Sequence, residues 1–219
     1  TPIGNLEDVT LRALRILNDV DVILCEDTRV TRKLLIRYEI SKQVLSYHEH
    51  SSIVRIAEIV ALLKGEKNLA LVTDAGTPGI SDPGSILVQK VREALPEVKI
   101  ESVPGPSALT AALSIAGLPV HDFVFLGFLP HKKGRETLFK EIAESGRTTV
   151  FYESPHRILR ALESLMKFAP NKKVTIAREL TKIHEEVKKG TPTELLEFFK
   201  TNHEKVRGEF VVMVSGLCG

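Results

Sequence analysis

The sequence predicts an α/β fold with mostly parallel sheets, because short apolar runs alternate with amphipathic stretches along most of its 219 residues. The apolar runs have the length and composition of buried strands and lie at 20–26, 68–74, 98–104, 122–128, 147–153, 173–179 and 209–216. Apolar side chains at helical spacing occur between them, at 51–67, 154–168 and 191–200.

The ends of these helical stretches carry start and stop signals. The first starts at Ser51 and has a glycine as a stop signal at position 65, and the second opens with Ser154 and with Pro155 in the position of a first helical residue. The third opens with Thr191 and has a glutamate three residues later, which is a capping-box pattern.

A break in this alternation lies at 116–122. There the alanine-rich helical stretch 107–117 ends with Gly117, and a proline precedes the next predicted strand. We therefore expect two domains, 1–117 and 118–219.

The composition is that of an ordinary globular protein, with 43% hydrophobic and 26% charged residues. No run approaches the roughly 20 apolar residues that a membrane span needs, and no signal peptide is visible, so we expect a cytoplasmic protein without membrane contact. The two cysteines, Cys25 and Cys218, do not indicate a disulfide framework. A net charge of +2 gives no global field for nucleic acid, although 29–37, 130–136 and 188–190 are locally basic.

Polar, glycine and proline residues follow the predicted strands where ligands bind in open α/β sheets, at the carboxyl ends. Five such strand ends suggest a cleft between the two halves; they are the segments 25–29, 72–84, 104–108, 152–157 and 177–182.

The stretch VTDAGTPGISDPG (72–84) favours either an elaborate turn or a loop against which a ligand lies. Its glycines permit unusual φ angles and its prolines stiffen the chain, while Asp82 would cap a helix that begins at Pro83. The Asp-Ala-Gly-Thr-Pro beginning places a carboxylate and a hydroxyl beside exposed backbone, which suits a polar, adenosine-like ligand.

Several familiar signatures are absent from the sequence. It has no G-x-G-x-x-G, no phosphate-binding G-x-x-x-x-G-K-[ST] and no G-x-S-x-G nucleophile elbow. The seven histidines do not have zinc-site spacing, so we expect no metal.

Six motifs and the closing GEFVVMVSG together resemble the ribosomal RNA small subunit methyltransferase I family, within the tetrapyrrole-methylase-like (class III) S-adenosylmethionine-dependent enzymes. The motifs occur in order between residues 1 and 182: TPIGNLEDVTLRAL, EDTR, DAGTPGISDPG, PGPSA, FYESPHR and ARELTK. The resemblance implies two α/β domains of tetrapyrrole methylase type with S-adenosylmethionine in the inter-domain cleft, in a homodimer. It also implies 2′-O-methylation of a cytidine ribose in 16S rRNA near the decoding centre. The family has a hydrophobic strand before TPIGN, so we expect residues to precede Thr1.

The resemblance also implies which residues contact the cofactor. The methionine and ribose side is expected to meet Ile3, Gly4 and Asn5, together with Asp74, Ala75, Gly76, Thr77 and Pro78. A further turn is expected to contribute Ser107 and Ala108, and the adenine is expected near Tyr152, Glu153, Ala177 and Arg178.

Methyl transfer to a ribose hydroxyl requires alignment, and a base or a cation near the hydroxyl should help. Strand ends offer five catalytic candidates, namely Asp27, Arg29, Arg178, Glu179 and Lys182. Each has a structural alternative: a helix N-terminal carboxylate for Asp27, an inter-domain ion pair for Arg178 with Glu179, and a solvated side chain for Lys182. The sequence does not choose a general base.

Basic residues that follow the strand ends are candidates for RNA contact, namely Arg32, Lys33, Lys132, Lys133 and Arg135. The near-neutral net charge favours a structured target such as 16S rRNA in an assembled small ribosomal subunit. Two other functions stay open: methylation of a small tetrapyrrole-like metabolite, and a non-catalytic assembly factor that binds S-adenosylmethionine.

Overall fold

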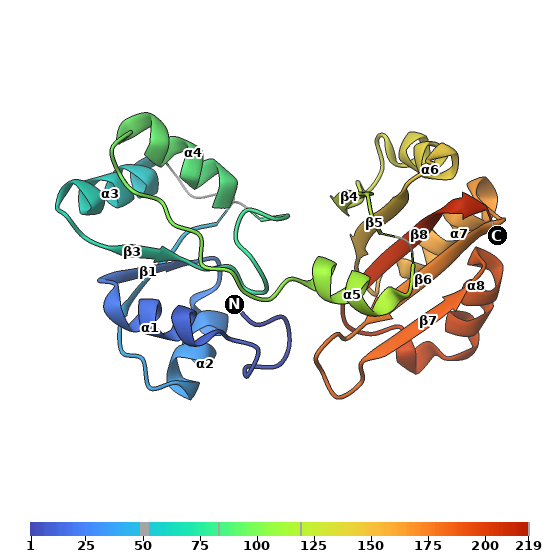
Figure 1. Ribbon diagram of the computed structural model, residues 1–219, viewed down its shortest axis with the longest axis horizontal. Coiled ribbons are helices and arrows are strands. Elements are labelled where there is room, and N and C mark those ends of the chain that lie inside the picture. Colours follow the sequence, from blue (N-terminus) through green and yellow to red (C-terminus); the bar gives the residue numbers. More distant parts are fainter. Residues whose placement is uncertain (49–52, 83, 119, 219) are drawn as a thin grey trace. The chain divides into compact units, whose positions relative to one another are not determined.

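The computed structural model describes residues 1–48, 53–82, 84–118 and 120–218, and the chain forms two compact units, Thr1–Ser107 and Ala108–Gly219 (Figure 1). The sequence places the boundary after Gly117, so the two divisions differ in the unit to which the helix Ala108–Ala116 is assigned. No helix among the described residues is long and apolar enough to cross a membrane.

The first unit is built on a parallel sheet with the strand order β2-β1-β3, where β1 is Val22–Cys25, β2 is Gln43–Ser46 and β3 is Leu69–Leu71. Its helices are α1 (Leu11–Asp19), α2 (Thr28–Arg37), α3 (Ile53–Lys64) and α4 (Gly84–Ala94). Figure 1 shows α3 and α4 on one face of the sheet and α1 and α2 on the other.

The central strand β1 is buried on both faces and divides the core of this unit into two layers. Ile23 and Cys25 pack with α1 and α2, whereas Val22 and Leu24 pack with α3 and α4. Because successive side chains of a strand point to opposite faces, a continuous apolar run is what such a doubly covered strand requires.

The second unit has a mixed sheet with the order β4-β5-β8-β6-β7. Its strands are β4 (Phe123–Phe128), β5 (Thr148–Glu153), β6 (Lys172–Arg178), β7 (Glu186–Gly190) and β8 (Phe210–Cys218). Only β4 and β5 are parallel, and β8 runs antiparallel between β5 and β6. The expectation of mostly parallel sheets is therefore wrong here, because the short connection between β6 and β7 makes an antiparallel pair and β8 returns between two existing strands.

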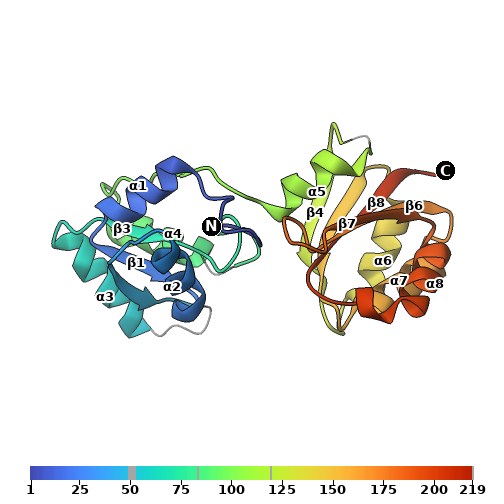
Figure 2. The same ribbon diagram turned by 90° about the horizontal axis from the view of Figure 1, so that it is seen from below.

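Helices cover both faces of this sheet (Figure 2). Those on one face are α6 (Arg135–Glu144), α7 (Ile158–Phe168) and α8 (Pro192–Thr201), followed by a short 3₁₀ turn at His203–Lys205. On the other face, α5 (Ala108–Ala116) packs against β6 and β8, which is why it groups with this unit. The core lies under α6, α7 and α8 and includes the fully buried rings of Phe151, Phe199 and Phe210.

Several predicted elements differ from the structure. Residues 98–104 form no strand: the Ser102 carbonyl accepts a hydrogen bond from Arg12 (2.6 Å), and Pro104 has no N–H to donate to a ladder. The sequence reading missed β2 and β7, which are short and partly exposed.

Helix starts were predicted with mixed success. The capping box of Thr191 and Glu194 is present at α8, with Pro192 in the first turn. The second predicted helix begins at Ile158 and not near Pro155, because a turn hydrogen-bonds the Arg157 and Ile158 amides to the Ser154 carbonyl. Ser51 and Pro83, the other two predicted start signals, lie outside the described residues.

Candidate functional site

Three of the segments singled out in the sequence meet at the carboxyl ends of β1 and β3. Thr1 and Gly76 exchange backbone hydrogen bonds, N to O in both directions at 3.0 Å, and the Thr1 hydroxyl donates to the Thr73 carbonyl (2.7 Å). The Asp27 amide donates to Asp74 Oδ1 (3.1 Å). The parallel pairing of β1 with β3 brings these ends together, so the first unit holds residues 1, 27 and 74–76 in one place.

Residues 72–82 form a loop that is closed by its own side chains. Asp82 Oδ1 accepts from the Gly79 amide (2.7 Å) and the Gly84 amide (2.8 Å), which caps the start of α4. Gly76 and Gly79 have φ angles of 88° and 86°, in the left-handed region that glycine adopts without strain. The predicted capping role of Asp82 is therefore confirmed.

The residues expected to contact the cofactor differ in exposure within this unit. Ile3 and Gly76 are buried, and the Thr77 hydroxyl donates to the Pro106 carbonyl (3.2 Å). Partly or fully exposed positions, which could meet a ligand, are Gly4, Asn5, Asp74, Ala75, Thr77, Pro78 and Ser107. Ala108 belongs to the second unit, as the first residue of α5.

Asp27 caps α2, with its Oδ1 accepting from the Arg29 amide at 2.8 Å. The Arg29 guanidinium also binds both carboxylate oxygens, through Nε at 3.0 and 3.1 Å and a terminal nitrogen at 2.6 Å. The hydrogen bonds from the Arg29 side chain and backbone lower the pKa of Asp27 to about 2. A carboxylate with that pKa is a weak base near neutral pH, so Asp27 fits the helix-capping alternative better than proton abstraction.

An apolar cavity of about 80 Å³ lies beneath this edge of the first unit. Its lining includes Thr1, Ala13, Leu34, Val72 and Pro106. A pocket for a ligand of the size of a nucleoside is several times larger. The exposed loop surface, and not this cavity, is therefore the part of the unit that suits a polar ligand.

In the second unit, strand register separates the expected adenine-side residues into two rows. Tyr152, Val211 and Ala177 are paired across β5, β8 and β6, and Glu153, Phe210 and Arg178 form the next row. Successive residues of a strand point to opposite faces. Phe210 belongs to the core beneath α6–α8, so Glu153 and Arg178 point to that face, and Tyr152 and Ala177 point to the other.

Glu153 is a fully buried carboxylate held between two arginines. Its oxygens lie 3.3 Å from Arg135 and 2.8 Å from Arg157, whose side chains are each 15% exposed. The same guanidinium groups donate to the Pro130 and Leu129 carbonyls, at 3.2 and 3.0 Å. This cluster joins the end of β5 to the loop that follows β4. Arg135, which the sequence analysis assigned to RNA contact, is therefore bound to Glu153 and to the Pro130 carbonyl instead.

Arg178 is also buried, in a second cluster with one carboxylate and two cations. It lies 3.3 Å from Glu186 and donates to the His184 carbonyl (3.2 Å), and Lys205 contacts the other oxygen of Glu186 at 2.6 Å. With 8% of its side chain exposed, Arg178 presents little surface to a reactant.

Glu179 and Lys182 lie on the turn after β6 and form an ion pair of 2.8 Å. Glu179 and Thr181 have φ angles of 50° and 65°, which strain non-glycine residues. The turn is held by the Glu209 carbonyl, which accepts from the Glu179 amide, and by Glu185, whose carboxylate accepts from the Thr181 amide. Strain of this kind gathers at functional sites.

The protonation states on this turn are set by the ion pair. Burial alone would raise the pKa of Glu179, but the hydrogen bond and charge of Lys182 outweigh it and the pKa lies below its usual value. Burial would lower the pKa of Lys182, but Glu179 and Glu209 raise it. At neutral pH the pair is therefore a carboxylate and an ammonium group, and Lys182 offers a positive charge rather than a base.

Four of the five basic residues predicted to contact RNA are exposed. Arg32 and Lys33 lie on α2, and Lys132 and Lys133 lie on the loop before α6. Among the residues that the structure describes, no carboxylate forms an ion pair with any of these four. No group of histidine, cysteine, aspartate and glutamate side chains in the described ranges could hold a metal ion.

Sequence reasoning missed two residues that shape these sites. Arg157 lies four positions after Glu153, a spacing that signals an ion pair only if the intervening turn is known. Gly208 has a φ of 76°, and a Cβ there would collide with the Glu179 carboxylate. The GEF motif in the sequence does not indicate that its glycine leaves room for the Glu179 carboxylate, which follows β6.

Comparison with known proteins assigns the two α/β units to a class of methylases. A family model described as tetrapyrrole (corrin/porphyrin) methylases matches residues 1–196. The fold is also that of cobalt precorrin-4 methyltransferase, with a TM-score of 0.70 at 17% identity over 97% of this chain and 90% of the other. A uroporphyrin-III C-methyltransferase from Thermus thermophilus has a TM-score of 0.65 at 20% identity, over 98% and 91%.

Closer relatives define the family within that class. The chain is 47% identical over 217 residues to ribosomal RNA small subunit methyltransferase I of Thermotoga maritima, covering 99% of this chain and 96% of the relative. It is 44% identical to the protein of the same name from Escherichia coli O157:H7, covering 99% and 76%. The chain belongs to this methyltransferase family, which confirms the resemblance and the fold class inferred from its motifs.

We expect Gly208→Ala to lower the free energy of unfolding by about 1–3 kcal/mol, because the alanine must adopt a left-handed φ and displace Glu179. Urea unfolding followed by circular dichroism measures this change. Gly146→Ala is the matched control: nothing lies within 4 Å of a Cβ at that position, so its effect should stay within about 0.5 kcal/mol. Equal effects of the two substitutions would contradict the contact.

The Asp27 carboxylate should contribute to stability above the pKa of an unfolded aspartate, about 3.9, and lose that contribution as the pH falls through about 2. The sign follows from a folded pKa below the unfolded one. Asp27→Asn keeps a capping side chain but loses the charge, so the difference in urea midpoint between wild type and variant should be constant above about pH 5 and shrink below about pH 4. A difference that grows on acidification would refute this assignment.

Proposed function

We propose that this methyltransferase transfers the methyl group of S-adenosylmethionine to the 2′-hydroxyl of a cytidine ribose in 16S rRNA. The observation that carries the proposal is the 40–47% identity, over nearly the whole chain, to relatives named ribosomal RNA small subunit methyltransferase I. We expect it to act as a homodimer on the small ribosomal subunit, in the cytoplasm where subunits are assembled.

The residues of the first unit fit the proposed cofactor by their chemistry. S-adenosylmethionine would supply a methyl group on a positively charged sulfur. The partly exposed Asp74 carboxylate suits the hydroxyl and ammonium groups of such a molecule, and the exposed backbone around Ala75 suits close approach. We therefore assign the exposed and half-buried positions of 3–5 and 74–78 to cofactor binding, namely Gly4, Asn5, Asp74, Ala75, Thr77 and Pro78.

In the proposed reaction, S-adenosylmethionine would supply its methyl group to the ribose 2′-oxygen in place of the sulfur, and the hydroxyl proton would pass to water. Asp27 and Glu179 are both ionised and both have lowered pKa values, so neither is a strong proton acceptor at neutral pH. Lys182 supplies a positive charge that would stabilise the oxygen as it loses its proton. Alignment of the two reactants then accounts for most of the catalysis.

Small ribosomal subunits from cells that lack the enzyme should accept one labelled methyl group per subunit from radiolabelled S-adenosylmethionine. Nuclease digestion should locate the label on one cytidine ribose of 16S rRNA. A parallel incubation with a uroporphyrin-type tetrapyrrole, the class of substrate named by the structural neighbours, should yield no labelled product. Binding of the cofactor without transfer to the subunit would refute the proposed reaction and leave an assembly factor.

Lys132 and Lys133 should contact phosphates, because both are exposed and the described residues offer them no carboxylate partner. Replacing each by alanine should flatten the dependence of log K on log salt concentration by roughly 0.7 per lysine. The measurement is fluorescence anisotropy of a labelled single-stranded RNA at several salt concentrations. Lys64→Ala, an exposed lysine at the end of α3, is the control and should leave the slope unchanged.

A further inference from the structure

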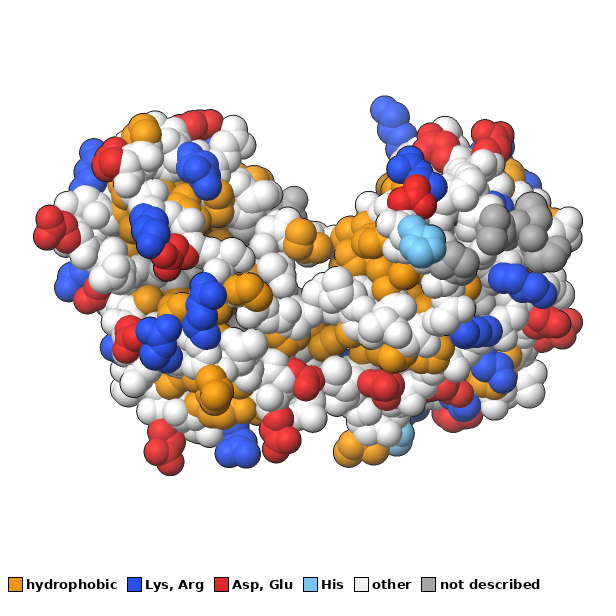
Figure 3. All heavy atoms as spheres, viewed as in Figure 1, with side chains coloured by type: hydrophobic (Ala, Val, Ile, Leu, Met, Phe, Trp, Pro, Cys, Tyr) orange, Lys and Arg blue, Asp and Glu red, His pale blue; other side chains and the backbone are white. Residues whose placement is uncertain are grey.

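Three aromatic side chains lie at the edge of the second sheet, the exposed Phe128 and the half-buried Phe125 and Tyr152, and we call them the aromatic patch. The Tyr152 ring makes edge-on contacts with Phe125 and Phe128, with ring centroids 4.9 and 5.4 Å apart. Phe128 is 51% exposed. Figure 3 shows hydrophobic side chains gathered over the part of this unit that contains β4 and β5.

A β-bulge turns Phe128 toward this patch. Phe125 pairs with Val150, so a regular ladder would pair residue 127 with Tyr152, but Phe128 occupies that place. The extra residue puts Phe128 on the same face as Phe125 and Tyr152 instead of the face covered by α6 and α7. Gly127, with a φ of 61°, supplies the left-handed backbone of the bulge. The bulge at Gly127 therefore leaves Phe128 exposed on this face of the sheet.

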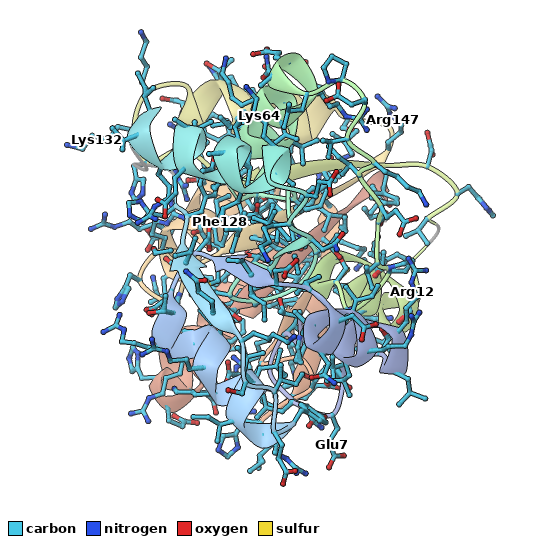
Figure 4. The ribbon with its side chains drawn as sticks, turned by 90° about the vertical axis from the view of Figure 1, so that its left-hand side faces the viewer. Glu7, Arg12, Lys64, Phe128, Lys132 and Arg147 are labelled. Carbon is cyan, nitrogen blue, oxygen red and sulfur yellow. The ribbon has the colours of Figure 1, made fainter. Side chains whose placement is uncertain are left out.

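The loop that follows the patch is basic, and its ends are fixed. Residues 131–133 are His-Lys-Lys and are all exposed. The carbonyls before them, of Leu129 and Pro130, accept hydrogen bonds from Arg157 and Arg135, which are both anchored on Glu153. Figure 4 shows the Lys132 side chain extending away from the ribbon, on the same side of the view as Phe128. Through these two arginines, Glu153 therefore holds the backbone that leads from Phe128 to the lysines.

We propose that Phe128, at the exposed end of the aromatic patch, and this basic loop bind an unpaired nucleotide of the RNA substrate, with its base stacked on Phe128 and neighbouring phosphates near Lys132 and Lys133. The inference rests on the proposed function and names the part of the RNA that this unit recognises. Proteins bind single-stranded RNA by stacking bases on aromatic rings beside cationic groups that contact the backbone. Exposed lysines on the loop that follows Phe128 match a polyanion and do not match an apolar protein segment.

Phe128→Leu should weaken binding of a 12-nucleotide single-stranded RNA by about tenfold, because a leucine cannot stack with a base. A 2-aminopurine placed in the RNA should be quenched by the wild-type protein and less so by the variant. Phe128→Tyr keeps the ring and should bind within about twofold of wild type. Phe123→Leu is the matched control on the same strand, 38% exposed and distant from the basic loop along the chain, and should leave binding unchanged.

The same variants are titrated with S-adenosylmethionine by calorimetry and sedimented to measure their oligomeric state. The inference is supported if Phe128→Leu loses RNA affinity alone. It is overturned if RNA binding is unchanged, if cofactor affinity falls in parallel, or if the oligomer dissociates, since the patch would then belong to the cofactor site or to a subunit contact. Wild-type protein that shows the Phe128-dependent binding but transfers no methyl group would refute the proposed reaction and leave this inference standing.

Discussion

The insertion of β8 between β5 and β6 is the constraint on which the second unit depends. This last strand of the chain pairs with strands that precede it by dozens of residues, and its start, Phe210, lies in register with both Glu153 and Arg178. The residue before it supplies the carbonyl that accepts from the strained Glu179 amide, and Gly208 leaves room for the Glu179 side chain. The candidate site at this edge is therefore completed only when the most distant segment has been added.

Two charged clusters at this edge, one buried and one half-buried, follow the same electrostatic pattern. Glu153 is bound by Arg135 and Arg157, and Glu186 is bound by Arg178 and Lys205, so each carboxylate has two cations. Removing charges from water is costly, and hydrogen bonds to backbone carbonyls from three of these cations offset part of that cost. Each cluster keeps one excess positive charge, which favours an anionic partner on the unit that carries them.

The features that could be predicted from the sequence are those that depend on residues close together in the chain. The cap of Asp82, the capping box of Thr191 and the polar strand ends all depend on spacings of a few residues, and the structure contains them. Long-range pairing could not be predicted in this way. The composition of residues 210–218 does not indicate that they pair between two earlier strands, and the composition of 98–104 does not indicate that Arg12 donates a hydrogen bond to the Ser102 carbonyl. The bulge at Gly127 is a matter of register, and register depends on the partner strand.

The two units have loop chemistry of opposite character, and this difference agrees with the two molecules that the proposed reaction needs. The strand ends of the first unit carry Asp27 and Asp74, and Asp27 is already neutralised by Arg29, so the partly exposed Asp74 is the carboxylate left for a ligand. A cofactor with a sulfonium and an ammonium group suits that surface. The second unit adds exposed Lys132 and Lys133 to its two cationic clusters, and RNA suits that surface because its charge lies on the phosphates. An uneven distribution of charge also explains how a net charge of only +2 is compatible with the proposed RNA substrate, since binding depends on where the charges lie and not on their sum.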